Sequence, residues 1–189
     1  TTEIDTDAAN DKSISADIVF FDGTAAAPPG GATWKEAENT STTLAIGENV
    51  RLRIAVADAT GTQATDYDYR LEYASKSGVS CGDDESWITM PITATTEHFE
   101  MTTSTYFADG DPTTAQLSNP EGYTFVAGKM VEDPSNSSGN ITLPVENYTE
   151  IELVFQANAN ATGSYCFRLT KAGIVLNEYP VYPELEIAP

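Results

Sequence analysis

Apolar and polar residues alternate with a period of two along much of this 189-residue chain. In residues 148–173 the alternation occurs on both sides of a short polar turn, as expected for two strands that each bury one face. The residues predicted to face a core are Ile151, Leu153, Phe155, Ala157, Tyr165, Phe167 and Leu169. Glu150, Glu152 and Arg168 fall between them and are expected to face water. The pattern predicts a hairpin around which the rest of the chain packs.

Shorter alternating stretches are separated by glycine, proline and acidic turns, which predicts eight or nine strands in total. These further strands are expected at residues 12–21, 50–56, 66–73, 98–102, 123–131, 141–145 and 185–187. The strands at 50–56 and 66–73 are expected to form the centre of a sheet, with Arg51 and Arg53 pointing outward. Pro180 and Pro183 predict that the last strand lies at a sheet edge, because proline cannot donate to a central ladder. The expected fold is an all-β, antiparallel, Ig-like β-sandwich.

The first eleven residues form a polar arm that precedes the first strong strand. Along this arm Thr2, Ile4, Thr6 and Ala8 alternate with acidic residues. The chain length fits one sandwich domain, so we expect an N-terminal arm at residues 1–11 and a single domain at residues 12–189.

Charge restricts the expected partners. The 29 acidic and 9 basic residues give a formal net charge of −20, which disfavours nucleic acid and anionic membrane surfaces. No apolar run approaches the roughly 18 residues of a membrane span. A chain that starts at Thr1 fits a mature secreted protein, so an extracellular or cell-surface location is expected.

Cysteine usage supports the same location. Cys81 and Cys166 lie 85 positions apart without metal-ligand spacing, which favours a disulfide, with two buried thiols in a reducing cytosol as the alternative. Five sequons are candidate N-glycosylation acceptors, although several arise by chance in a chain rich in Thr and Asn. They are Asn39, Asn136, Asn140, Asn147 and Asn160.

An ordered set of motifs resembles a known repeat domain. The motifs are YRLEY (69–73), Cys81, Trp87, YFADGDPTT (106–114), FVAG (125–128), TEIE (149–152), YCFRLTKAG (165–173) and VYPELEI (181–187). Together they resemble Ig-like domains that occur, often in tandem, in large secreted surface proteins of candidate-phyla-radiation bacteria. The resemblance covers roughly residues 48–188. It implies an extracellular, disulfide-bearing sandwich with a structural or adhesive role and no catalysis.

Few residues offer chemistry. His98 is the only histidine, which argues against zinc sites and Ser-His-Asp arrangements, and it is expected to be a strand residue. Asp109 with Asp111, and Asp83 with Asp84, are weak calcium candidates, with solvated turns as the alternative reading. We therefore expect no enzymatic activity and no cofactor other than an optional structural Ca²⁺.

Two functions fit these features. The favoured one is a structural subunit of an extracellular filament or cell-surface assembly, in which the arm at residues 1–11 adds to the sheet of a neighbouring copy. Residues 181–187 are a second candidate donor strand. The alternative is a surface-displayed adhesive or carbohydrate-binding module whose partners are glycans or other cell surfaces, and a hydrolase ranks a distant third.

Overall fold

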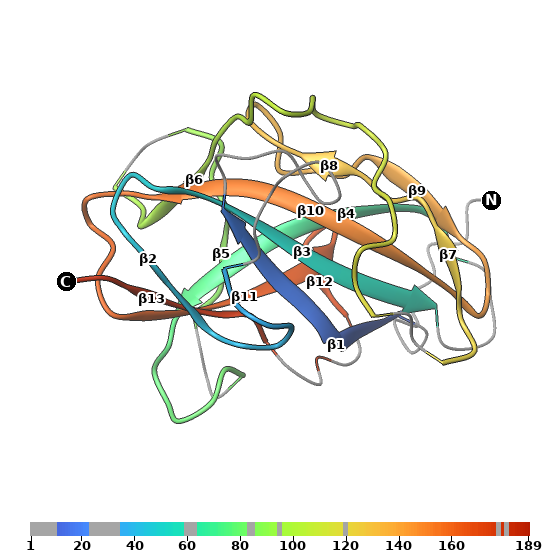
Figure 1. The fold of residues 1–189 in the computed structure, drawn as a ribbon, viewed down its shortest axis with the longest axis horizontal. Helices are drawn as coiled ribbons and strands as arrows, with labels where there is room; N and C mark the ends of the chain where they lie inside the picture. Colours follow the sequence, from blue (N-terminus) through green and yellow to red (C-terminus); the bar gives the residue numbers. More distant parts are fainter. Residues whose placement is uncertain are drawn as a thin grey trace.

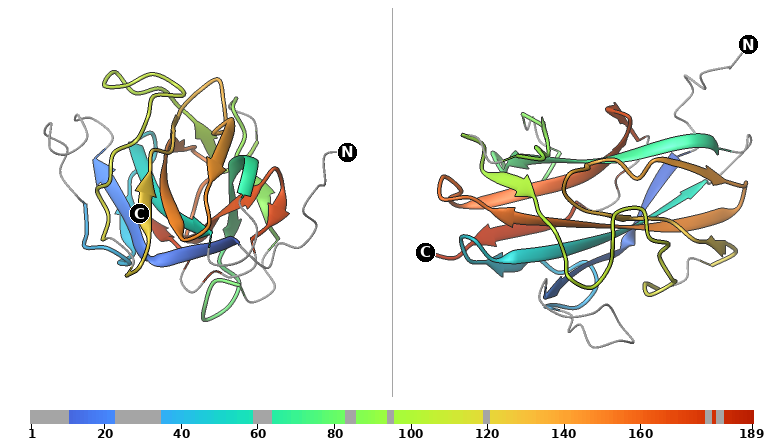
Figure 2. Two further views of the ribbon diagram at one scale, coloured as in Figure 1. Left: turned by 90° about the vertical axis from the view of Figure 1, so that its right-hand side faces the viewer. Right: turned by 90° about the horizontal axis from the view of Figure 1, so that it is seen from above.

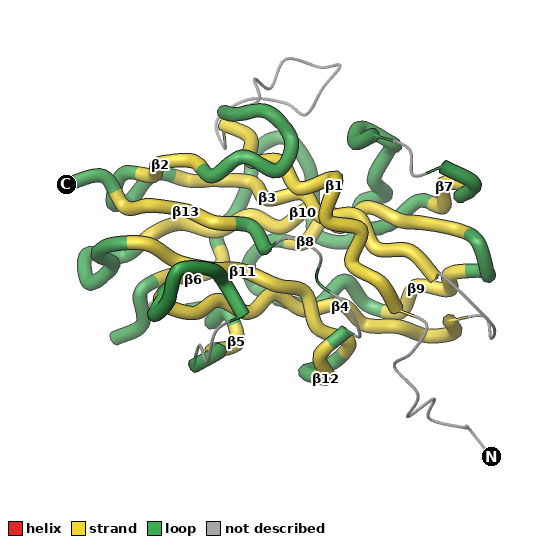
Figure 3. Tube along the Cα trace, turned by 90° about the horizontal axis from the view of Figure 1, so that it is seen from below, coloured by secondary structure: helices red, strands yellow, loops and turns green. Residues whose placement is uncertain are grey.

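The computed structural model describes residues 11–22, 35–58, 64–82, 86–93, 96–118, 121–176, 179 and 182–189. Within these residues the chain consists of strands and loops without a helix (Figure 3). The strands are β1 (Asp11–Asp22), β2 (Thr42–Leu44), β3 (Asn49–Asp58), β4 (Ala64–Ser75), β5 (Ile88–Thr89), β6 (Phe99–Met101), β7 (Thr124–Val126), β8 (Met130–Val131), β9 (Asn140–Leu143), β10 (Asn147–Ala157), β11 (Ser164–Lys171), β12 (Ile174–Val175) and β13 (Glu184–Ile187).

The strands form two mostly antiparallel sheets, which confirms the predicted all-β sandwich (Figure 1). The first sheet has the order β1-β3-β10-β6, and β7 and β8 also pair with β10. The second sheet has the order β2-β13-β11-β4-β5, with β12 on β11 and β9 on β4. Most strands run along the long axis of the molecule (Figure 2).

The long alternating stretch does not fold into a hairpin. β10 pairs with β3 in the first sheet, whereas β11 pairs with β4 in the second, so the turn between them crosses the sandwich. Likewise β3 and β4, expected as neighbours at the centre of one sheet, lie in opposite sheets. The predicted apolar faces are correct, but they meet across the core: the rings of Phe155 and Phe167 stack at 5.1 Å between centroids.

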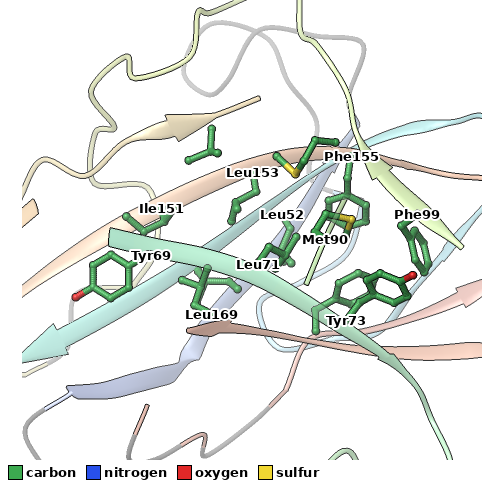
Figure 4. Close-up of a cluster of buried hydrophobic side chains, with 14 of the residues drawn as sticks. Leu52, Tyr69, Leu71, Tyr73, Met90, Phe99, Ile151, Leu153, Phe155 and Leu169 are labelled. Atoms are coloured by element: carbon green, nitrogen blue, oxygen red, sulfur yellow. The ribbon is translucent and has the colours of Figure 1, made fainter. Parts of the chain in front are cut away.

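The core lies between the two sheets and is rich in aromatic side chains (Figure 4). The ring of Phe99 on β6 contacts those of Tyr73, Phe155 and Tyr165 edge to face, with centroid distances of 4.8–5.8 Å. Edge-to-face pairs add stabilisation beyond the buried area itself. These contacts join β6 and β10 of the first sheet to β4 and β11 of the second.

The C-terminal strand is not an edge strand. β13 pairs with β11 on one side and, in parallel, with the unpredicted strand β2 on the other. Pro183 does not confine the strand to an edge, because it precedes the first strand residue, Glu184. Every residue within β13 has a backbone N–H that can donate a hydrogen bond.

The predicted disulfide between Cys81 and Cys166 is confirmed. In β11 the core-facing residues are Tyr165, Phe167 and Leu169, so Cys166 lies on the outer face of the second sheet. An Ig domain instead bridges its two sheets with its disulfide. Here the bond fastens an outer loop onto β11.

Candidate functional site: the β1 edge of the first sheet

The strand nearest the N-terminus completes one edge of the first sheet. β1 lies antiparallel to β3 (Figure 1), with Asp11–Ile14 opposite Asp58–Ala55 and Val19–Asp22 opposite Arg53–Val50. Between these segments four residues of β1 face one residue of β3, Ile54, so the ladder is interrupted. On its other side β3 pairs with β10 through nine consecutive residues without interruption. β1 is therefore the less regularly paired neighbour of β3.

β3 itself is buried almost throughout. Val50, Leu52, Ile54 and Val56 face the main core, and the alternate residues are equally buried on the opposite face. Backbone groups of such a strand can be satisfied only at its edges, and here strands occupy both edges of β3. Without β1, this edge of β3 would present unpaired backbone groups to which another strand can bind.

The outer face of the first sheet contains buried charges, contrary to the expectation that it faces water. Arg51, Arg53, Glu150 and Glu152 all have side chains that are 0% exposed. Arg53 Nε donates to Glu152 Oε2 at 2.7 Å, and its Nη1 donates to Glu150 Oε2 at 2.8 Å and to the carbonyl of Thr114 at 2.7 Å. These ion pairs cross-link β3 to β10.

Residues 102–118 and 121–132, here called the covering segment, lie over that face. The backbone amides of Gln116 and Leu117 donate to Glu150 Oε1 at 3.0 and 3.1 Å, and Thr113 Oγ1 donates to the Glu150 carbonyl at 2.7 Å. At Gly128 a Cβ atom would lie 2.1 Å from the same carbonyl oxygen, so only glycine allows this approach. The covering segment excludes water from the charges, which the strand pattern alone could not reveal.

The outer edge of β4 is closed by side chains as well as strands. β9 and β5 pair with the two ends of β4, and the loop between them covers Tyr69 and Leu71. Asn136 Oδ1 accepts from the Leu71 amide at 2.9 Å, while its Nδ2 donates to the carbonyls of Leu71 and Met90 at 3.0 and 2.9 Å. Ser138 exchanges hydrogen bonds with the backbone of Tyr69 in the same way. Hydrogen bonds of this kind satisfy the backbone of an edge and keep it from pairing with another chain.

Other inner strands also have partners along both edges. The far edge of β10 is covered by β7 and β8, which run parallel to it, and by the antiparallel β6. The far edge of β11 is covered by β13 and β12, with the carbonyl of Pro183 accepting from the Phe167 amide between them. β1 differs from these short coverings because eight of its residues pair with β3.

In the described part of the connection from β1 to β2, two residues fasten the chain to the body. Lys35 forms an ion pair with Glu48, and both carboxylate oxygens of Glu38 accept from Ser118, one from its amide at 3.1 Å and one from its hydroxyl at 2.7 Å. Between Asp22 and Lys35 lie the 12 residues 23–34, here called the tether, which include Pro28-Pro29-Gly30-Gly31. Fully extended, the tether spans roughly 40 Å.

Most of the predicted arm falls outside the described residues. Thr2, Ile4, Thr6 and Ala8 all precede β1, and the described chain begins at Asp11, the last residue assigned to the arm. Among the sequons, Asn39, Asn140 and Asn160 are exposed and Asn147 is half-buried. Asn136 is 8% exposed and its amide closes the β4 edge, so a glycan there is incompatible with the folded structure.

The two described calcium candidates, Asp109 and Asp111, each accept a hydrogen bond from a backbone amide. Asp111 Oδ2 accepts from the Ala108 amide at 2.9 Å and stabilises its own turn, whereas Asp109 Oδ1 accepts from the Glu132 amide at 3.1 Å and fastens that turn to the residue after β8. Asp83 and Asp84 lie outside the described residues. No group of three metal-ligating side chains occurs in the part of the chain that the structure describes.

His98 is a packing residue adjacent to β6 rather than within it. Its ring contacts those of Tyr73 and Tyr165, at centroid distances of 6.1 and 5.3 Å. The Tyr73 hydroxyl donates to Glu97 Oε2 at 3.0 Å and accepts from the His98 amide at 3.3 Å. Burial raises the pKa of Tyr73 above its ordinary value.

Stacked planar groups cover part of the outer face of the second sheet. The Arg168 guanidinium lies 4.2 Å from the centre of the Trp87 ring, Trp87 stacks on Tyr182 at 5.6 Å, and Tyr182 stacks on Tyr179 at 5.1 Å. Arg168 also pairs with Glu72 at 2.7 Å. Trp87 therefore packs on the residue two positions after Cys166.

A shallow hollow lies beside the closed edge of β4. It has a volume of about 380 Å³ and is lined by Arg70, Thr89, Met90, Pro91, Ile92, Pro134, Ser135, Asn136 and Ser137. Arg70, its only charged side chain, is held by Asp68 at 2.8 Å. The hollow thus contains no unengaged charge among its lining residues.

Sequence reasoning missed three contributors to the β1 edge. They are the covering segment, the anchors Lys35 and Glu38, and the position of residues 11–22 at the sheet edge beside β3. Opposite charges on Arg53 and Glu152 are the one signal that indicated adjacent strands, although many other acidic residues could have paired with Arg53.

No protein-family model matches the chain, and a comparison with curated proteins finds no match.

Proposed function

We propose that this chain is a structural subunit of an extracellular filament or cell-surface assembly, whose copies join by adding an N-terminal strand to the sheet of a neighbour. The observation that carries the proposal is the position of β1. The strand β1, joined to the rest of the body by a 12-residue tether, completes the edge of β3, which is buried almost throughout. Main-chain hydrogen bonds to such an edge give affinity in known strand-addition complexes.

Several further features support an extracellular assembly. The disulfide between Cys81 and Cys166 is typical of proteins in oxidising compartments. Side-chain hydrogen bonds and short strands cover the edges of β4, β10 and β11, so few strand edges are open to an added strand. The C-terminal segment is a poor donor, because β13 already pairs on both sides.

The stacked rings favour the structural role over carbohydrate binding. A sugar packs on the open face of an aromatic ring, but Trp87 and Tyr182 each contact planar neighbours in the stack. We therefore propose that the stacked side chains stabilise the second sheet. An adhesive role remains the alternative function, and glycan-array binding by the monomeric protein tests it.

Electron microscopy of the purified full-length protein tests the proposal directly. We expect unbranched fibres, and we expect a variant lacking residues 1–22 to form none. A variant lacking the stretch 1–10 serves as the matched control, because it keeps β1. Fibres formed by the protein lacking residues 1–22 would contradict assembly through the N-terminal strand.

A further inference from the structure

We propose that the donated segment is β1 itself, and that Asp11–Asp22 of one copy takes the place beside β3 of the next copy. This inference rests on the proposed function and specifies its donor and its acceptor. It differs from the sequence-based hypothesis, in which residues 1–11 add to an existing sheet edge. In the exchanged arrangement no new edge is needed, because the strand that leaves one copy fills the same place in another.

The acceptor is the edge of β3, which cannot remain empty. β3 is buried on both faces, and its second edge is fully engaged by β10 through residues 49–57. Without β1, the backbone N–H and C=O groups along residues 50–58 lose their ladder partners. An edge strand with unpaired backbone groups is a template for another strand, so a copy that has released its own β1 binds an equivalent strand from another copy.

The donor strand, β1, can separate from β3 more readily than β10 can. Its pairing with β3 consists of two four-residue segments separated by the interruption opposite Ile54. Pairing that is broken in this way is less strongly specified than the continuous β3–β10 ladder. β1 is also the outermost strand of its sheet, so its departure leaves β3, β10 and the strands beyond them in place.

The tether is long enough for exchange. The contacts of Lys35 with Glu48 and of Glu38 with Ser118 fasten the chain to the body just after the tether. The remaining residues 23–34 span up to roughly 40 Å. A domain of this size has a radius of about 20 Å, so the tether can cross from one copy to the next.

The geometry then decides between a closed monomer and a polymer. When β1 folds back on its own copy, the result is a monomer. When it pairs with the next copy, donor and acceptor surfaces differ, so each added copy leaves one β1 and one β3 edge for the next. Such a contact propagates into a fibre unless the rotation closes a ring.

Cysteine cross-linking in the full-length protein tests the exchange. Ser13 and Val56 face each other in the β1–β3 register, and so do Lys12 and Ala57. Subunits carrying only Ser13→Cys are mixed with subunits carrying only Val56→Cys, assembled into fibres and oxidised. We expect disulfide-linked dimers that contain one subunit of each kind. The pair Lys12→Cys and Ala57→Cys provides the same test if the core substitution at Val56 prevents folding.

Two control experiments accompany the cross-linking test. Mixing Thr43→Cys subunits with Val56→Cys subunits should give few mixed dimers, because Thr43 lies on β2, beside Glu186 of the other sheet. The double variant S13C/V56C, oxidised while dilute, should close within one subunit and polymerise at least tenfold more slowly than the same protein left unoxidised. The native cysteines do not compete, because they are bonded to each other.

The outcomes separate this inference from the proposed function. Fibres with mixed dimers at either register pair support exchange of β1. Fibres that give no mixed dimers at either register pair, while S13C/V56C still closes within one subunit, overturn the exchange and leave strand addition by another segment. The complete absence of fibres from the unmodified protein overturns the proposed function, and the exchange with it.

Discussion

Arg53 has a fully buried side chain at a position whose alternation predicted contact with water. It bonds Glu150, Glu152 and the carbonyl of Thr114, so its removal leaves two carboxylates in a site without water. Breaking a buried pair from one side costs about 3–5 kcal/mol of unfolding free energy. We expect Arg53→Met to destabilise the protein by that amount in urea denaturation.

Arg70→Met is the matched control for this substitution. Arg70 pairs with Asp68 at 2.8 Å, but its side chain is 44% exposed. Exposed pairs contribute about 0–1 kcal/mol. Equal effects of the two substitutions on the urea midpoint would contradict the assignment of Arg53 to a water-free network.

The residue pattern predicted which side chains share a face, but not whether water reaches that face. Ile151, Leu153 and Phe155 lie in the core as expected. Glu150 and Glu152 share the opposite face as expected, yet they are buried because the covering segment lies on them. No local pattern in that segment indicates where it packs, since its contacts with Glu150 are made mainly by backbone amides.

At the scale of elements, Asn136 holds an edge that strands leave open. Asn136→Ala would leave the Leu71 amide and the Met90 carbonyl without their Asn136 partner, while the Leu71 carbonyl would keep the Met90 amide as a donor. The loss of buried hydrogen bonds of this kind costs about 1–3 kcal/mol per unsatisfied group. We therefore expect a loss of at least about 2 kcal/mol in thermal or urea unfolding, together with increased aggregation through the opened β4 edge.

Asn140→Ala provides the comparison, because Asn140 also belongs to a sequon but is exposed on β9. Surface substitutions usually change stability by less than about 0.5 kcal/mol. A stable, non-aggregating Asn136→Ala variant would show that the loop does not protect the edge.

The existence of strands could be predicted from sequence, whereas their partners could not. The alternation at residues 148–173 is the same whether the two strands pair side by side or face each other across a core. Here the turn crosses the sandwich, and β10 and β11 pair with β3 and β4 instead. Short strands such as β2 and β5 carry too few residues for a recognisable period, and their positions follow from the long strands that they flank.

At the scale of the whole molecule, net charge opposes the assembly that the N-terminal strand would promote. Each copy carries a formal charge of −20, so two copies repel each other as they approach. The Debye length falls from about 30 Å at 0.01 M salt to roughly 6 Å at 0.3 M. Added salt therefore weakens the repulsion between copies while it leaves the main-chain hydrogen bonds of strand addition largely unaffected.

We expect the initial rate of fibre growth, followed by light scattering, to rise by on the order of tenfold between these two salt concentrations. The protein lacking residues 1–22 should show no increase, which separates strand addition from simple salting-out. The oxidised S13C/V56C monomer should behave like that truncated protein, because its β1 cannot leave β3. If fibre growth instead slows as salt is added, attraction between oppositely charged surfaces drives assembly. That result would contradict the prediction that charge repulsion between copies opposes strand addition.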